Sequence, residues 1–227
     1  MMISPEIYYE EYLKGKIKER KMTAIRGLKQ KIGRFKNTIE NPYAGIKTVT
    51  HPSEETRIQC TREYLERVKE AYVEAGGTYT LSKSEEKSAD FNANIDSICR
   101  ITFSIGGYFG GNSSYIVELT DELKAYTKLW EDEEPLSMWD NYNEEPFTKD
   151  AFIEALKKLD IGEWRRRYST KRFGYMALDG TQWELEFKYI NGHKPISYDG
   201  DNSYPYNFNK FQMLFGIDDT EEEYEDE

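Results

Sequence analysis

The sequence lacks the features that would place the chain in a membrane or on an export pathway. It has 227 residues, and its longest uncharged run, residues 101–117, is interrupted by glycines and polar residues. A membrane-spanning helix needs about 20 predominantly apolar residues. Glu6, Glu10 and Glu11 stand where a secretory signal would carry basic and then apolar residues. The sequence therefore predicts a cytoplasmic protein with no membrane partner.

Cysteine and histidine are also scarce. Cys60 and Cys99 are the two cysteines, and His51 and His193 are the two histidines. Zinc sites need closely spaced Cys and His ligands, and none of these four residues has such a neighbour. We therefore predict no metal site, no cofactor and no identifiable catalytic residue. Without an export signal, the two cysteines are predicted to be reduced thiols.

Aromatic residues are plentiful and charge is unevenly distributed. The chain is 15% aromatic, which favours a folded protein, and its net charge is −11. Residues 14–36 contain ten Lys or Arg against Glu19 alone, a local charge of +9 that leaves −20 for the remainder. Ile25, Leu28 and Ile32 recur at helical spacing in this segment. The pattern predicts an amphipathic basic helix.

This basic helix has several possible roles. It can be a solvated face of a docking helix, a footprint for nucleic acid or an acidic protein, or a surface that meets the chain's own acidic stretches. The candidate partner-binding residues on it are Lys29, Lys31, Arg34 and Lys36. We expect an acidic protein surface as the partner, and binding to it should persist at moderate salt because aromatic anchors rather than rim charges carry most interface energy.

The order of the patterns predicts an α+β fold. Residues 1–145 form a helix-rich N-terminal domain with the basic helix, a helix capped by Ser53, a helix near 84–99, one β-hairpin and a helix from Thr120. Residues 146–217 form an α-β-β-β-α module, and residues 218–227 form a disordered acidic tail. Asp-Gly and Asn-Gly pairs after residues 178, 190 and 198 predict an antiparallel meander.

Residues 183–189 of this meander alternate between apolar and charged side chains. Trp183, Leu185 and Phe187 share one face, and the other face carries Glu184, Glu186 and Lys188. The first face is predicted to be buried and the second to be solvated.

Two further segments of the module carry candidate partner-binding residues. An aromatic side chain interleaved with arginines suits phosphate or an acidic protein patch, and it equally suits a solvated helix end. The loop after residue 198 is explained largely as turn and helix-capping residues, with a binding rim as the alternative. The candidates are Trp164, Arg165, Arg166 and Arg167, and then Asp199, Asp201 and Tyr204.

A metal-dependent nuclease is the enzymatic alternative. Asp179, Glu186 and Lys188 superficially match the acid and acid-x-Lys arrangement of restriction-type nucleases. Any solvated strand face produces such a triplet, and Asp179 is explained by its turn.

Residues 147–217 resemble a C-terminal module that recurs in accessory proteins of plasmids, phages and integrative elements of Gram-positive bacteria. The marks of the resemblance are residues 179–183 (DGTQW) and the stretch from Gly200 to Phe208. Proteins of that setting include anti-CRISPR inhibitors. The resemblance implies a non-enzymatic protein that binds a host defence enzyme, with a CRISPR effector nuclease as one possible partner. A nucleic-acid-binding protein, or the nuclease above, remains the alternative.

Overall fold

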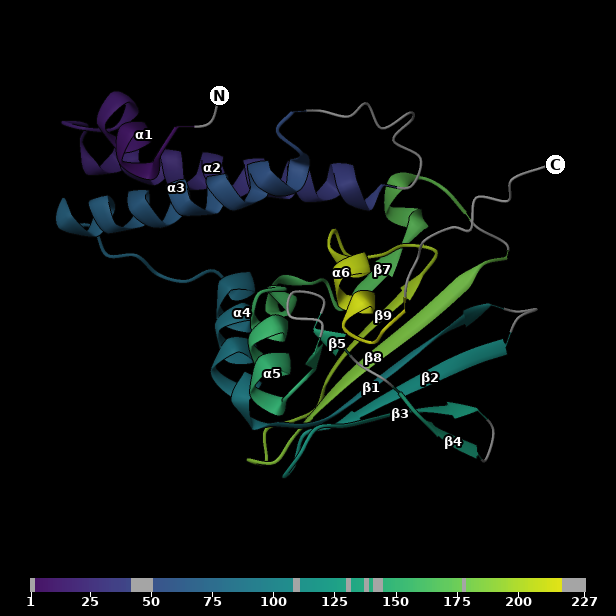
Figure 1. The fold of residues 1–227 in the computed structure, drawn as a ribbon. Helices are drawn as coiled ribbons and strands as arrows, with labels where there is room; N and C mark the ends of the chain where they lie inside the picture. Colours follow the sequence, from purple (N-terminus) through teal and green to yellow (C-terminus); the bar gives the residue numbers. More distant parts are fainter. Residues whose placement is uncertain are drawn as a thin grey trace. The chain divides into compact units, whose positions relative to one another are not determined.

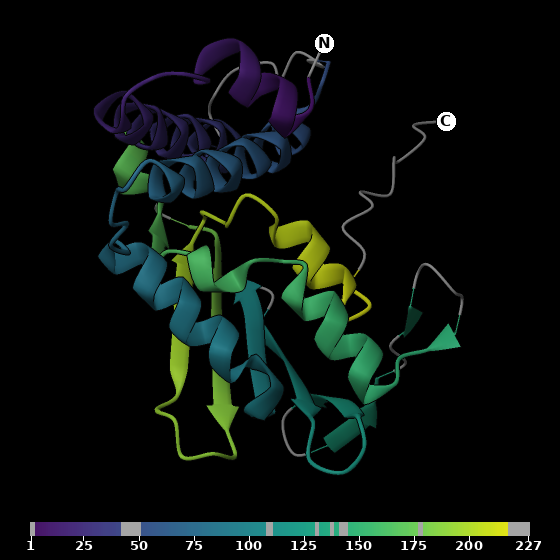
Figure 2. The same cartoon turned by 90° about the vertical axis from the view of Figure 1, so that its left-hand side faces the viewer.

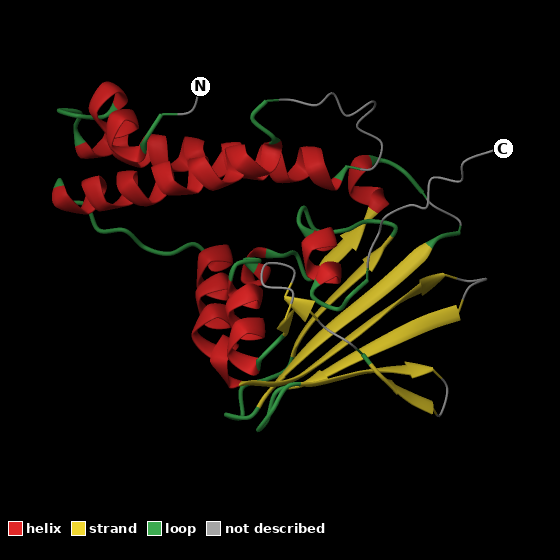
Figure 3. Ribbon diagram, viewed as in Figure 1, coloured by secondary structure: helices red, strands yellow, loops and turns green. Residues whose placement is uncertain are grey.

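The computed structural model describes residues 3–41, 51–107, 111–129, 132–136, 139–140, 145–176 and 179–217. The chain divides into two compact units, Met1–Ser82 (unit 1) and Lys83–Glu227 (unit 2). The fold is mixed α+β, as the sequence predicts, with helices in both units and, in the described residues, a seven-stranded sheet in unit 2 (Figures 1 and 3). The tail predicted to be disordered, residues 218–227, lies outside the described residues.

Unit 1 consists of helices in its described part. Ile25 and Leu28 are buried in one cluster with Val68, because each helix turns one apolar stripe toward its neighbour. The Ser53 hydroxyl accepts a hydrogen bond from the Thr56 amide at 3.3 Å and caps the third helix, as predicted. The helices are α1 (Pro5–Tyr12), α2 (Lys18–Glu40) and α3 (Glu54–Glu74).

One cation of the basic segment is part of the interior of unit 1. Lys21 is buried, and its ammonium donates to the Ala71 carbonyl oxygen at 3.1 Å. The same nitrogen lies 5.5 Å from the centre of the Tyr9 ring. A buried ammonium requires such partners, so Lys21 joins α2 to α3 and is not part of the solvent surface.

Unit 2 packs helices against one face of a mostly antiparallel sheet (Figures 1 and 2). The order of strands across the sheet is β4-β3-β2-β1-β8-β9-β7, with β5 and β6 paired separately. The helices are α4 (Lys83–Asn94), α5 (Lys149–Lys157) and α6 (Phe208–Met213), with short 3-10 helices at Ile95–Ser97, Ile161–Glu163 and Thr170–Phe173. The strands are β1 (Ile98–Gly107), β2 (Gly111–Glu118), β3 (Lys124–Leu129), β4 (Asp132–Pro135), β5 (Trp139–Asp140), β6 (Glu145–Pro146), β7 (Arg167–Ser169), β8 (Thr181–Tyr189) and β9 (Ile196–Asp201).

The pairing of β1 with β8 determines where the chain divides. Phe103 lies opposite Leu185, and Ile105 lies opposite Trp183, so the hairpin formed by β1 and β2 is continuous with the C-terminal strands. The boundary predicted near residue 145 therefore falls inside unit 2, and the division observed lies after Ser82.

The alternation predicted for residues 183–189 is confirmed. Trp183, Leu185 and Phe187 are each at most 1% exposed, whereas Glu184 and Lys188 are exposed. The apolar face packs against an aromatic cluster that includes Phe103, Phe152, Phe208, Phe211 and Phe215. Edge-to-face contacts dominate this cluster, for example 5.1 Å between the ring centres of Phe103 and Phe211.

Three local predictions differ from the structure. The helix predicted from Thr120 is strand β3, because residues 124–128 pair with β2. Residues 173–176 form no strand; the third neighbour in the C-terminal group is β7, which pairs in parallel with β9. Gly200 lies within β9 and does not end the strand. A Cβ atom at position 200 would collide with the Trp183 indole. The last helix of the module, α6, begins at Phe208, after Asn207.

The segment from Ser203 to Phe208 is held to the core by two indole groups. Trp183 donates its ring N–H to the Ser203 carbonyl oxygen at 3.0 Å, and Trp164 donates its ring N–H to the Asn207 side-chain oxygen at 2.9 Å. Both indoles are 1% exposed. An unpaired N–H in this position would cost about 1 to 3 kcal/mol, so the loop is part of the folded core.

Replacing Trp183 tests this arrangement. We expect Trp183→Ala to lower the free energy of unfolding by about 3 to 5 kcal/mol, because it leaves a cavity and removes the bond to Ser203. Glu184→Ala, at the adjacent exposed position, should change it by less than about 0.5 kcal/mol. Urea unfolding of both variants and the parent measures the difference. Equal stability of the three proteins would contradict the described packing.

Candidate partner-binding face

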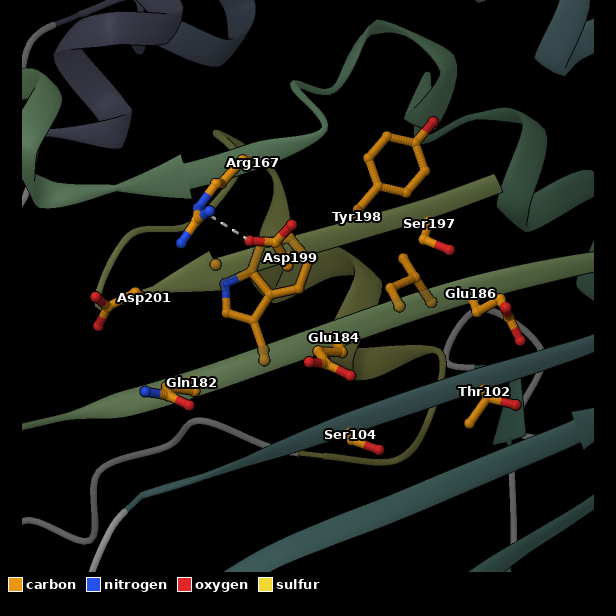
Figure 4. A pocket seen from close by; sticks show the side chains of 13 residues that line it. Thr102, Ser104, Arg167, Gln182, Glu184, Glu186, Ser197, Tyr198, Asp199 and Asp201 are labelled. Atoms are coloured by element: carbon orange, nitrogen blue, oxygen red, sulfur yellow. Dashed lines mark ion pairs between the residues drawn. The ribbon is translucent and has the colours of Figure 1, made fainter. Parts of the chain in front are cut away.

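The sheet face opposite the helices is the candidate functional site. Its side chains come from alternating positions of neighbouring strands, which the strand register brings into rows. One row crosses five strands and consists of Ser114 (β2), Ser104 (β1), Glu184 (β8), Asp199 (β9) and Arg167 (β7). Figure 4 shows Glu184 between Ser104 and Asp199 in this row.

Two contacts order the ends of the row. The hydroxyl oxygens of Ser104 and Ser114 lie 3.0 Å apart. At the other end the guanidinium of Arg167 lies 3.4 Å from the Asp199 carboxylate (Figure 4). The side chains of Arg167 and Asp199 are 79% and 50% exposed, so this ion pair is solvated and contributes little to stability. Both charges remain accessible to a partner.

A hollow of about 660 Å³ lies over this part of the face. Its volume is in the range of small-molecule sites, but such sites are mostly apolar, and the solvent-facing side chains around this one are polar or charged. Four acidic side chains line the hollow: Glu184, Glu186, Asp199 and Asp201. The other polar side chains that line it are Thr102, Ser104, Gln182, Ser197 and the cationic Arg167. The arrangement is that of a shallow, polar, predominantly acidic contact surface.

The structure brings together only some of the residues that the sequence singled out. Arg167, Asp199 and Asp201 line the hollow, while Arg165 is exposed beside them in sequence. Trp164 is buried in the aromatic core, so it does not provide the surface ring that the sequence suggested. Tyr204 is half-buried and packs on Phe208, with 5.0 Å between ring centres.

Arg166 has a supporting role. Its guanidinium donates to the Ser197 carbonyl oxygen at 3.3 Å and lies 4.8 Å from the centre of the Tyr198 ring. These contacts hold the β9 edge beside the candidate face. Burial raises the pKa of Tyr198 to about 12, so its hydroxyl stays protonated and donates to the Ile161 carbonyl oxygen.

The candidate residues of α2 belong to unit 1. Lys29 lies 5.2 Å from the centre of the Tyr79 ring, and Lys31 lies 5.8 Å from that of Phe35. Lys36 is half-buried, and Arg34 is exposed.

The nuclease triplet does not converge. Glu186 and Lys188 form an ion pair of 3.2 Å, but Asp179 precedes β8. At about 3.3 Å per strand residue, Thr181 and Glu186 alone are about 16 Å apart. Within the described ranges, no group of three or more His, Cys, Asp or Glu residues could hold a metal ion. The described carboxylates therefore form a surface rather than the clustered ligand set that metal-assisted hydrolysis needs.

The comparisons with known proteins identify no relative. No family model, no curated protein and no solved structure matches this chain. The described helices include none that is both long and apolar enough to cross a bilayer.

A titratable lysine lies behind the face. Lys87 of α4 donates to the Trp164 carbonyl oxygen, and its ammonium lies 5.2 Å from the centre of the Tyr198 ring. Burial, helped by the nearby charge of Arg166, lowers the pKa of Lys87 from 10.5 to about 8. Charged Lys87 is therefore a cost to folding at neutral pH.

This cost gives a pH-dependent stability. Between pH 8 and 10.5 the unfolded chain binds a proton at Lys87 that the folded chain does not, so folding becomes more favourable as the pH rises through this window. We expect the stability of the parent relative to Lys87→Met to increase from pH 7.5 to pH 9.5, measured by urea unfolding. The exposed Lys158→Met should show no such pH-dependent difference. If the difference in free energy of unfolding between the parent and Lys87→Met did not change with pH, the lowered pKa of Lys87 would be contradicted.

Proposed function

We propose that this chain is a non-enzymatic protein-binding inhibitor from a mobile genetic element, acting on a host nucleic-acid-handling defence enzyme in the manner of anti-CRISPR proteins. The observation that carries the proposal is the candidate face: a solvent-accessible sheet surface with four carboxylates and one arginine around a shallow hollow. A surface of this kind can bind a partner without performing chemistry on it.

The charge of the face indicates the kind of partner. Residues 1–82 contain 15 Lys and Arg and 11 Glu, a net charge of +4. Because the net charge of the whole chain is −11, residues 83–227 carry −15. Enzymes that bind nucleic acid present basic grooves to the phosphate backbone. An acidic, polar face is complementary to such a groove, and charge complementarity raises the association rate and the specificity of binding.

The sequence resemblance of residues 147–217 supports the same class of protein. The stretch that carries it, from Gly200 to Phe208, includes the segment that the two tryptophans hold against the core. The resemblance thus falls on residues that position Asp199 and Asp201 at the candidate face. A CRISPR effector nuclease is the partner that this setting favours.

Charge reversal on the candidate face tests the proposal. We expect the immobilised chain to capture one nucleic-acid-handling protein stoichiometrically from a nuclease-treated host lysate, and to inhibit nucleic-acid cleavage by that purified protein. Glu184→Lys combined with Asp199→Lys should abolish capture and inhibition, because both substitutions place cations against a basic groove.

The matched control reverses two exposed carboxylates away from the hollow. Glu122→Lys combined with Glu134→Lys makes the same change in net charge and should preserve capture and inhibition. Thermal unfolding followed by circular dichroism checks that both double variants are folded. Equal loss of capture and inhibition in both double variants would assign the effect to net charge and contradict a role for the candidate face. Metal-dependent cleavage of nucleic acid by the chain alone would contradict the proposal and favour the nuclease alternative.

A further inference from the structure

Helix α2 presents a second charged surface, on unit 1. Arg20, Arg26, Lys31 and Arg34 are all exposed. At 100° per residue they lie within an arc of about 140°, centred away from the buried stripe of Ile25 and Leu28. From Arg20 to Arg34 the arc extends along about 21 Å of the helix axis. We call these four residues the α2 cationic face.

Three of these cations have no ionic partner in the part of the chain that the structure describes. Some other cations of unit 1 are paired: Lys14 lies 3.0 Å from Glu10, and Arg67 lies 2.7 Å from Glu6. Arg20, Arg26 and Arg34 make no comparable contact with any described residue. Their charge is therefore not neutralised by the helices that surround them, and it is available to an external anion.

A glycine lies in the middle of the face. Gly27 is exposed in the interior of α2, where glycine disfavours the helix. Its φ is not positive, and a Cβ atom there would meet no atom of the chain within 4 Å. Nothing in the described packing requires this glycine. A residue without a side chain between four cations allows an extended ligand backbone to approach the helix closely.

The remaining exposed side chains of this segment distinguish a nucleic acid from a protein partner. Between Arg20 and Arg34 the exposed residues other than the cations are Thr23, Gly27 and Gln30. Protein interfaces depend on buried aromatic or aliphatic anchors, and this surface exposes none. Arginine with interspersed Thr and Gln is instead the residue set that contacts phosphate oxygens. A nucleic-acid ligand for this face would differ from the protein partner expected from the sequence, because the apolar residues of the segment are turned inward.

We propose that the α2 cationic face binds the phosphodiester backbone of a nucleic acid without reading its bases. The inference goes beyond the proposed function and does not rest on it, because it concerns different residues and a different class of ligand. Each arginine can form two hydrogen bonds to one phosphate, and Lys31 contributes a fourth positive charge.

The salt dependence of binding measures the number of phosphates neutralised. Fluorescence anisotropy of the full chain with labelled 20-nucleotide single strands and with the corresponding DNA and RNA duplexes gives the affinity at each salt concentration. Four contacts predict a fall of about 50- to 150-fold between 50 and 200 mM salt, the smaller value for single strands. The three probes distinguish which form of nucleic acid the face prefers.

Two sets of substitutions separate this face from general charge. Replacing Arg20, Arg26, Lys31 and Arg34 together by Gln should abolish binding at 50 mM salt. Replacing four exposed lysines of unit 2, Lys124, Lys128, Lys158 and Lys194, by Gln makes the same change in net charge and should preserve it. All substituted positions are exposed, and circular dichroism checks that both proteins are folded.

Gly27 provides a second test that keeps the cations in place. Gly27→Ala should raise the melting temperature, because it favours the helix and meets no neighbour, and it should leave binding nearly unchanged because a single methyl group adds little bulk beside the ligand. Glu also favours a helix, but it adds a negative charge. Gly27→Glu should therefore weaken binding by about as much as the loss of one cation, roughly threefold to tenfold.

Several results would overturn the proposal. No binding of any probe at 50 mM salt would do so, and so would binding that survives the substitution of all four cations. Equal loss in the unit 2 control would assign the effect to net charge. Binding of polyglutamate as tightly as nucleic acid would show that the face accepts an acidic protein instead.

Discussion

Two buried indole N–H groups require a partner, and the way each is satisfied determines the geometry of unit 2. Trp183 and Trp164 are both 1% exposed, and their rings lie 6.3 Å apart in an edge-to-face arrangement. Neither N–H can reach water, so each must find an acceptor within the protein. The acceptors are the Ser203 carbonyl oxygen and the Asn207 side chain, and Asn207 in turn donates to the Leu159 carbonyl oxygen. A polar loop is thereby fixed inside an aromatic core, and the end of β9 is fixed with it.

The candidate face follows from this constraint. Trp183 points into the core, so strand alternation turns Glu184 outward, and the register with β9 places Asp199 beside it. Gly200 faces the Trp183 indole and has no side chain, which lets β9 lie close to the ring while Asp199 and Asp201 on either side remain accessible. The acidic row is thus the solvent side of the same strands whose other side carries the aromatic core. A change that loosens the core would also displace the carboxylates.

Local patterns in the sequence predict the parts of this arrangement that depend on neighbouring residues. The stripe of α2, the Ser53 cap and the alternation in β8 each arise from spacing within one element, and each appears as predicted. The pairing of β1 with β8 joins residues about 80 positions apart, and no local spacing encodes it. Residues 124–128 contain helix-favouring residues but pair with β2, because strand formation there depends on cross-strand packing more than on propensity. Arg167 reaches the site through a three-residue parallel strand, which is too short to give a periodic signal. The arginines next to Trp164 suggest a surface position, although Trp164 is a core residue.

The division of charge coincides with the division into units. Residues 1–82 carry +4 and residues 83–227 carry −15, so each unit has the sign of the surface that it presents: arginines on α2 and carboxylates on the open sheet face. Within unit 1, the cations that contribute to folding are the paired or buried ones, such as Arg67 and Lys21, whereas Arg20, Arg26 and Arg34 have no such contact in the described residues. Unpaired surface charge of one sign contributes repulsion rather than stability. The nucleic acid proposed as the ligand of the α2 cationic face would neutralise this charge. The same reasoning applies with the sign reversed to the carboxylates of unit 2 and the basic partner proposed for them, so the two proposals assign chemically different partners to the two units.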